Sequence, residues 1–245
     1  MDAYSTLSDV YDRLMNDVSY DKWVDYVLKL MARCGAPDDA KILDAGCGTG
    51  SVSVALAGFG FDVIGVDVSQ DMLNVAGEKA RKAGVSVAFI CQDLTELSLH
   101  KPVEVVNASC DVVNYIAPED IPAFFAAVFQ NLKSGGVFLF DISSDYKLQK
   151  VLGNNIFFED SDDLTMIWQN RLENKQVNMD LTLFKRNGEL FERSDEAHTQ
   201  YIHSIKSIKN DLTAAGFGEI LIFPCFGFET PEIDTERIQF CAIKG

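Results

Sequence analysis

The apolar positions of this chain fall into short runs that alternate with stretches of helical spacing. Five runs are rich in Val, Ile, Leu or Phe and are bounded by polar or glycine residues, which is typical of buried strands. These predicted strands cover residues 41–44, 61–67, 85–91, 103–109 and 137–141. The predicted helices between them cover residues 51–59, 69–83 and 120–132, with Val52, Leu56 and Phe59 as core candidates of the first. Such alternation indicates an α/β protein built on βαβ units.

The alternation stops after residue 144. Residues 145–203 contain strand-like stretches in which polar and apolar positions alternate, at 163–173, 176–186 and 189–202, and Asn187-Gly188 is a typical two-residue hairpin turn. The pattern therefore predicts an antiparallel β insertion placed over the ligand edge of the sheet. It serves either as a substrate lid or as a dimerisation or decorative sheet. Its candidate lid contacts are Trp168, Arg171, Phe184, Arg193, His198 and Tyr201.

The two ends of the chain complete the predicted elements. A helix beginning at Ser204 and ending at Gly216 is followed by strands at 217–224 and 238–243. Residues 1–36 precede the first strand and show helical spacing in two segments, the second starting near Ser19 or Asp21. Trp23 in this second segment is expected to pack in the core.

A glycine-rich turn, Asp44-Ala-Gly-Cys-Gly-Thr-Gly50, joins the first strand to the first helix. Glycines let a ligand approach the backbone, and the following helix aims N–H groups at that ligand. Dinucleotide-binding loops have the spacing G-x-G-x-x-G, whereas this turn has D-x-G-x-G-x-G. A carboxylate at this place repels a pyrophosphate and attracts a cation. The alternative, a turn with no ligand, is disfavoured by the acid and the three alternating glycines together.

Two further acids follow the next two strands. Asp67 ends the second strand about 20 residues beyond the turn, where a βαβ unit places the acceptor of ribose hydroxyls. Asp93 follows the third strand, and its alternative role is a cap on the next turn. Because the carboxyl ends of parallel strands meet at one edge of a sheet, we expect these acids to line one site.

Composition narrows the functional classes. The chain has 245 residues with 21 basic and 37 acidic side chains, a net charge of −16, which disfavours a nucleic-acid-binding surface. The six cysteines show no paired spacing, which favours free thiols in the cytoplasm, and no apolar run is long enough to cross a membrane. The three histidines form no metal-ligand pattern, and neither a G-x-S-x-G elbow nor a P-loop lysine is present.

The glycine turn resembles motif I of the class I methyltransferases that depend on S-adenosylmethionine, and residues 66–73 resemble their second motif. Residues 10–15 and 20–23 resemble the N-terminal cover of the small-molecule, glycine N-methyltransferase-like group. Residues 110–115 are similar to its fourth motif, with a departure at Val112. The resemblance implies a Rossmann-like α/β fold, with a seven-stranded sheet, helices on both faces, an antiparallel last strand and a small antiparallel β insertion.

The resemblance also implies a domain organisation. Residues 1–36 form an N-terminal helical cover, residues 37–144 and 204–245 form the domain that binds S-adenosylmethionine, and residues 145–203 form the lid. The implied cofactor-binding residues are Asp44, Ala45, Gly46, Cys47, Gly48, Gly50, Asp67, Val68, Gln92, Asp93, Leu94, Asp111, Asn114, Tyr11 and Tyr20. Asp111, Tyr115 and Tyr11 are candidates for accepting a proton, and Asp141 could face the substrate. No metal is expected.

The predicted function is transfer of the methyl group of S-adenosylmethionine to nitrogen or oxygen of a small molecule. The partners expected are therefore a small-molecule acceptor and, as a further option, a second copy of the chain. Three alternatives stay open: a tRNA or rRNA methyltransferase, a non-catalytic regulator that binds S-adenosylmethionine, and a nicotinamide-dependent oxidoreductase on a similar sheet. The charge disfavours the first, and the loop acid and glycine spacing disfavour the last.

Overall fold

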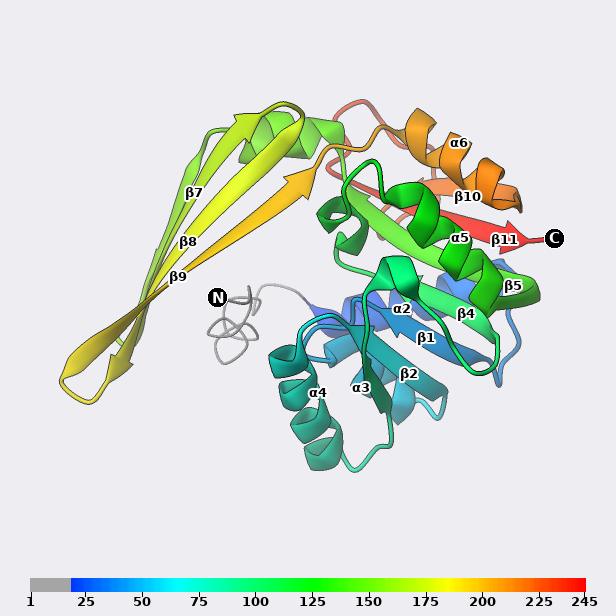
Figure 1. Cartoon of the computed structure of the whole chain (residues 1–245), viewed down its shortest axis with the longest axis horizontal. Coiled ribbons are helices and arrows are strands. Elements are labelled where there is room, and N and C mark those ends of the chain that lie inside the picture. The colour runs from blue at the N-terminus through cyan, green and yellow to red at the C-terminus, as the bar shows by residue number, and fades with distance from the viewer. Residues whose placement is uncertain (1–18) are drawn as a thin grey trace.

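A seven-stranded sheet forms the centre of the computed structural model, which describes residues 19–245 (Figure 1). Its strands are β1 (Lys41–Ala45), β2 (Asp62–Asp67), β3 (Ala88–Cys91), β4 (Val103–Ala108), β5 (Leu132–Ser143), β10 (Phe217–Pro224) and β11 (Arg237–Lys244). Their spatial order is β10-β11-β5-β4-β1-β2-β3. Strands β1 to β5 pair in parallel, and β11 runs antiparallel to both β5 and β10. The predicted fold class, including the antiparallel last strand, is confirmed.

Helices cover both faces of this sheet because its central strands are apolar on both sides. They are α2 (Tyr20–Arg33), α3 (Ser51–Gly58), α4 (Gln70–Ala83), α5 (Ile121–Asn131) and α6 (Ile205–Ala215). Along β5, Phe138 and Phe140 share one core with α5 and α6, while Val137 and Leu139 share another with α2 and α3. Trp23 is buried against the ring of Phe226, as expected. In the described part of the chain, no helix combines the length and apolarity needed to cross a membrane.

Two predicted helix starts are confirmed by their capping bonds. The Ser69 hydroxyl accepts a hydrogen bond from the Met72 N–H at 3.3 Å, and the Ser204 hydroxyl accepts one from the Ser207 N–H at 3.1 Å. Gly84 ends α4 in the left-handed conformation that glycine tolerates. These caps fix where α4 begins, and with it the loop that carries Asp67.

Some predicted boundaries and one core residue are wrong. Phe59 is 66% exposed, because α3 ends at Gly58 and the chain turns away from the core at Gly60. The third strand begins at Ala88 rather than at residue 85, and β5 is longer than predicted in both directions. Pairing with β4 and β11 accounts for the longer β5, since both partners extend its ladder.

The insertion is a second, four-stranded antiparallel sheet that extends away from the main sheet as a long twisted ribbon (Figure 1). Its strands are β6 (Ile156–Asp160), β7 (Leu164–Glu173), β8 (Gln176–Asn187) and β9 (Leu190–Tyr201), preceded by the short helix η4 (Lys147–Leu152). The sequence pattern missed β6 and η4. The β8–β9 hairpin is confirmed, but its two-residue loop is Gly188-Glu189, one position later than predicted, because Asn187 pairs with Leu190.

Candidate active site

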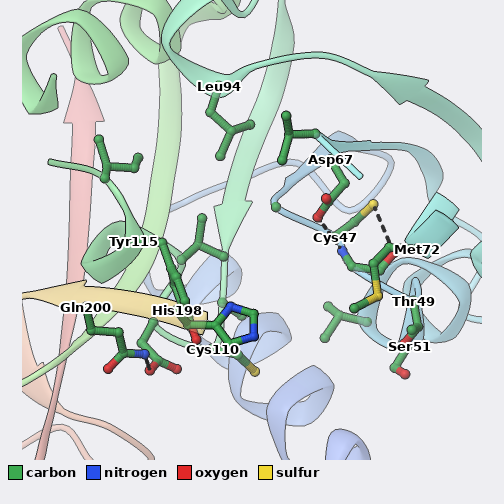
Figure 2. Close-up of a pocket in the computed structure, with 18 of the residues that line it drawn as sticks. Cys47, Thr49, Ser51, Asp67, Met72, Leu94, Cys110, Tyr115, His198 and Gln200 are labelled. Carbon is green, nitrogen blue, oxygen red and sulfur yellow. Dashed lines mark hydrogen bonds between the residues drawn. The ribbon is translucent and has the colours of Figure 1, made fainter. Parts of the chain in front are cut away.

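A cavity of about 580 Å³ lies at the carboxyl ends of the parallel strands, between the main sheet and the inner end of the insertion. Figure 2 shows its labelled residues in two groups, one with Cys47, Thr49, Ser51, Asp67 and Met72 and the other with Cys110, Tyr115, His198 and Gln200. The first group comes from β1, β2 and the helices after them. The second comes from the segment after β4 and from β9. One cavity therefore has two walls of different origin.

The glycine turn forms part of the first wall, and its glycines serve different purposes. Gly48 has φ +52, lines the cavity, and has no protein atom within 4 Å of the place where a Cβ would stand. Gly50 has φ +73, and a Cβ there would stand 2.7 Å from the Ala76 Cβ on α4. Gly48 thus leaves room for a ligand, whereas Gly50 permits α3 and α4 to pack closely.

Asp44 is a buried acid at the end of β1, and it lines the cavity although only 3% of it is exposed. Its oxygens accept hydrogen bonds from the Ser53 hydroxyl and from Asn107 Nδ2, the latter at 2.9 Å. Burial raises its pKa to about 6, although both hydrogen bonds oppose this shift. A positively charged ligand would stabilise the ionised form of Asp44, because no basic side chain in residues 19–245 forms an ion pair with it.

Asp67 ends β2 and is held in place by the backbone on both sides. Its Oδ2 accepts the Gly48 N–H at 2.8 Å, and its Oδ1 accepts the Ser69 N–H at 2.9 Å. A carboxylate has about four lone-pair positions, so each oxygen keeps capacity for one further donor. Burial raises its pKa in spite of these bonds. The structure therefore presents a fixed acceptor pair to the cavity.

Next to Asp67, the loop after β3 supplies both polar and apolar groups. Asp93 Oδ1 accepts from the N–H and the hydroxyl of Thr95, so the alternative role as a cap is present, and the residue also lines the cavity. Val68 is 64% exposed and lines the cavity together with Leu94. Gln92 does not line the cavity, because its amide bonds to the backbone of Glu96 and Ser98.

The structure brings most of the predicted site residues together. Those that line the cavity are Asp44, Gly46, Cys47, Gly48, Asp67, Val68, Asp93, Leu94, Asp111, Tyr115 and Tyr20. Ala45, Gly50, Gln92 and Asn114 do not line it. Tyr11 and the helix expected around it lie outside the described residues. Burial raises the pKa of the thiols of Cys47 and Cys110, so neither is an ionised nucleophile.

Asn114 was expected to face the cofactor, but its side chain is fully buried elsewhere. Its Nδ2 donates to the carbonyl oxygens of Ser143 and Tyr201, and its Oδ1 accepts the Ser143 N–H at 2.8 Å. It joins η3 (Val112–Tyr115) to β5 and to the end of β9. Asn114 therefore anchors the insertion to the main sheet.

A partly buried ion cluster forms part of the second wall. Arg237, the first residue of β11, donates from Nη1 to Asp111 Oδ1 at 2.9 Å and to Asp141 Oδ2. Asp141 also accepts the N–H groups of Cys110 and Asp111 and is fully buried. Contrary to the expectation from the sequence, it does not face a substrate. Burial raises the pKa of the Asp111 carboxyl, but Arg237 outweighs burial and holds it below its usual value.

The inner end of the insertion completes the second wall. Of the predicted lid contacts, Trp168 and His198 line the cavity, joined by Met166, Met179, Leu181 and Gln200. Arg171, Phe184, Arg193 and Tyr201 do not line it. Arg171 pairs with Asp180, and Arg193 lies against Phe184 at the surface. Only one end of the long ribbon therefore contributes to the site.

Sequence reasoning missed two cationic residues of the site, Lys147 and Arg237. Lys147 opens η4, which no periodicity revealed. The position of Arg237 at the site could have been predicted, because an antiparallel last strand begins at the edge where the parallel strands end. Among residues 19–245, no cluster of three or more His, Cys, Asp or Glu side chains is arranged to hold a metal ion.

Comparison with known proteins agrees with this geometry. A family model described as a methyltransferase domain matches residues 42–136. A protein of Geobacillus sp. (strain WCH70), whose name proposes a methyltransferase and states no acceptor, is 36% identical over 246 residues, 99% of this chain and 100% of that protein. YqeM of Bacillus subtilis (strain 168), named in the same way, is 31% identical. The match covers 98% of this chain and 97% of YqeM.

A solved structure extends the comparison to three dimensions. The S-adenosylmethionine-dependent methyltransferase from Clostridium acetobutylicum ATCC 824 superposes with a TM-score of 0.90 at 35% identity, covering 99% of both chains. The cavity of the present chain fits the same cofactor, since it offers a glycine cradle at Gly48, a fixed acceptor pair on Asp67 and an apolar strip at Val68. The chain belongs to the class I methyltransferases that depend on S-adenosylmethionine.

Proposed function

We propose that this methyltransferase acts on a small molecule and transfers the methyl group to a nitrogen or oxygen by in-line displacement. The observation that carries the proposal is that the insertion supplies a wall of the same cavity as the glycine turn. An acceptor space between two walls, next to the cofactor space, suits a small molecule. The insertion then acts as a lid. The chain falls in the glycine N-methyltransferase-like group, whose N-terminal sequence it resembles.

The residues of the first wall are assigned to the cofactor. Asp67 accepts the two ribose hydroxyls, Asp93 accepts the adenine amine through its Oδ2, and Val68 with Leu94 packs on the adenine ring. Asp44 attracts the positive charge of the amino-acid end. Tyr20, the first residue of α2, also lines the cavity and is assigned to the cofactor, and Tyr11 stays a prediction. When bound, S-adenosylmethionine supplies a methyl group that its sulfonium makes electrophilic.

Proton removal from the acceptor is assigned to His198. Asp111 is a poor base, since Arg237, Gln200 and Ser143 already occupy its oxygens. The His198 ring lies in the cavity wall, edge-on to Tyr115, with centroids 6.4 Å apart. Its Nε2 lies 3.2 Å from Glu196 Oε2, and both side chains are 5–6% exposed. A buried carboxylate that orients an imidazole is a recurring arrangement for general-base catalysis.

The test of this function is a methyl-transfer assay over a panel of small amines, phenols, carboxylic acids and sugars, with bulk tRNA as one member. We expect S-adenosylhomocysteine to form only with small molecules. Turnover with tRNA alone would contradict the proposal. Cofactor binding without turnover on any acceptor would favour the alternative of a non-catalytic regulator that binds S-adenosylmethionine.

The role of His198 is tested with His198→Gln and the first hydroxyl acceptor found. Loss of a general base lowers kcat by about 100-fold or more while KM for the cofactor stays constant. His203→Gln is the matched control, because His203 is a buried histidine that does not line the cavity. An equal kcat for His198→Gln and the unchanged protein would remove this assignment.

A further inference from the structure

The acceptor end of the cavity contains basic side chains, unlike the cofactor end. The chain carries a net charge of −16, and the cofactor end is lined by Asp44, Asp67 and Asp93. At the other end, two cations, Lys147 and Arg237, line the same cavity. Both cations are partly buried, which is an unusual location for basic side chains in an acidic protein.

Arg237 forms ion pairs with two carboxylates, whereas Lys147 forms none among residues 19–245. Asp111 and Asp141 both bond to the Arg237 guanidinium. No carboxylate in residues 19–245 lies within ion-pair distance of the Lys147 ammonium, which is only partly exposed. Burial and the neighbouring Arg237 lower the pKa of Lys147, although Asp111, Glu236 and Asp141 act in the opposite direction. Lys147 is thus a partly buried ammonium without an ion-pair partner in the described residues, whereas charges taken out of water are normally paired.

A second unpaired donor lines the same space. Trp168 Nε1 is buried without a hydrogen-bond partner in the described part of the chain, and a buried unpaired donor costs about 1–3 kcal/mol. The wall around it is otherwise apolar, with Met166, Met179 and Leu181. This wall suits an acceptor with an apolar body that also carries hydrogen-bond acceptors.

We propose, resting on the function proposed above, that the methyl acceptor is an organic acid, whose anionic group binds the Lys147 ammonium while its apolar body lies against the Trp168 wall. The cofactor's own carboxylate is the other anion that such a cation could bind. The experiment below distinguishes the two, because only the cofactor's carboxylate would make Lys147 matter for binding of S-adenosylhomocysteine.

The experiment is calorimetry on protein saturated with S-adenosylhomocysteine, titrated with 4-hydroxyphenylacetate and with its neutral amide. We expect the acid to bind about 10- to 100-fold more tightly than the amide, the range expected for a hydrogen bond to a charged group. Lys147→Met should abolish this preference, and Lys147→Arg should keep most of it. Lys150→Met is the matched control on the same short helix, because Lys150 is exposed.

The remaining outcomes overturn the proposal. These are equal affinity for acid and amide, no binding of the acid at millimolar concentration, or an acid preference that survives in Lys147→Met. If Lys147→Met instead lowers the affinity for S-adenosylhomocysteine by the same factor, the cation belongs to the cofactor and the proposal is also wrong. Failure of the unchanged protein to bind S-adenosylhomocysteine would be a separate result, against the function itself.

Discussion

At the residue scale, Asp67 connects the glycine turn, the second strand and the cavity. Its two backbone bonds to Gly48 and Ser69 hold the carboxylate in one orientation. Rigid placement of this kind lowers the entropic cost of binding a ligand with matching donors. The same carboxylate thus organises the loop and serves as the proposed acceptor for the ribose.

Replacing Asp67 by Ala should weaken binding of S-adenosylhomocysteine by about 1.5–3 kcal/mol, or about 10- to 150-fold, because charge-assisted hydrogen bonds are lost. Calorimetry measures the change. Asp62→Ala, at the exposed opposite end of the same strand, is the control and should bind as the unchanged protein does. Unaltered affinity in Asp67→Ala would remove the ribose assignment.

Asp44 makes binding depend on pH. Its folded-state pKa of about 6 lies above its ordinary value of 3.8, so ionised Asp44 destabilises the cofactor-free fold, and this cost grows as pH rises from about 4 to 6. A bound cation favours the ionised form. We therefore expect affinity for S-adenosylmethionine to rise as pH increases through about 6.

The control for this pH effect is Asp44→Asn, which cannot ionise. It should lose the pH dependence of binding and the fall in stability that ionisation of Asp44 causes as pH rises toward 6. Thermal melts and calorimetry between pH 5 and 8 measure both quantities. An unchanged pH profile in Asp44→Asn would assign the effect to another group.

Single residues also show where sequence reasoning succeeds and where it fails. Asp44, Asp67 and Asp93 could be placed because strand ends and glycine spacing are local signals. Asn114 could not, because its partners are backbone atoms 29 and 87 residues away in sequence. Arg237 and Asp141 form their ion pair across 96 residues, and no local pattern carries that information.

At the element scale, two glycines of one turn have different roles, one in helix packing and one at the cavity. Gly50 is needed for packing of α3 against α4, whereas Gly48 faces the cavity. The same distinction is invisible in the sequence, where both residues belong to one alternating motif. It depends on which side of the turn each glycine faces once α4 has packed.

Two alanine substitutions test that separation. Gly48→Ala should cost about 1–2 kcal/mol of stability from its left-handed backbone alone, while its methyl group blocks the cavity and lowers cofactor affinity by more than about tenfold. Gly50→Ala should pay the same backbone cost and lose about 1–3 kcal/mol more stability, because its methyl group overpacks against Ala76. The folded fraction of Gly50→Ala should bind the cofactor nearly as tightly as the unchanged protein. Denaturant melts and calorimetry measure the pair, and the reverse pattern would contradict the assignment.

Elements of the insertion were harder to predict than those of the main sheet. The strands β7, β8 and β9 alternate clearly, but β6 is a short edge strand whose side chains are largely exposed, so it lacks a buried face to set a period. The helix η4 is similarly short, with Leu148 and Leu152 as its buried residues. Both are fixed by tertiary contacts, chiefly the small core with Val177 and Met179.

At the scale of the whole molecule, charge and shape support the proposed substrate class. The net charge of −16 repels polyanions, and the cations Lys147 and Arg237 lie inside the cavity rather than on an open face. Apolar side chains are exposed on β6 and at the hairpin tip, among them Ile156, Phe158 and Leu190. Formation of a homodimer stays a prediction.

The charge leads to a simple expectation for RNA. A gel-shift titration with bulk tRNA in about 0.15 M salt should show no complex at about 10 µM protein, because phosphate binding depends on clustered surface Lys and Arg. Saturation with S-adenosylhomocysteine should not change this result. A complex at submicromolar protein would favour the RNA methyltransferase instead.

The most direct measurement is a crystal structure of the chain with S-adenosylhomocysteine. We expect the ribose hydroxyls within hydrogen-bond distance of Asp67, the adenine beside Val68 and Asp93, and the sulfur directed toward the space bounded by His198 and Trp168. A cofactor bound elsewhere, or bound with its sulfur turned away from the insertion, would contradict the assignment of the two walls.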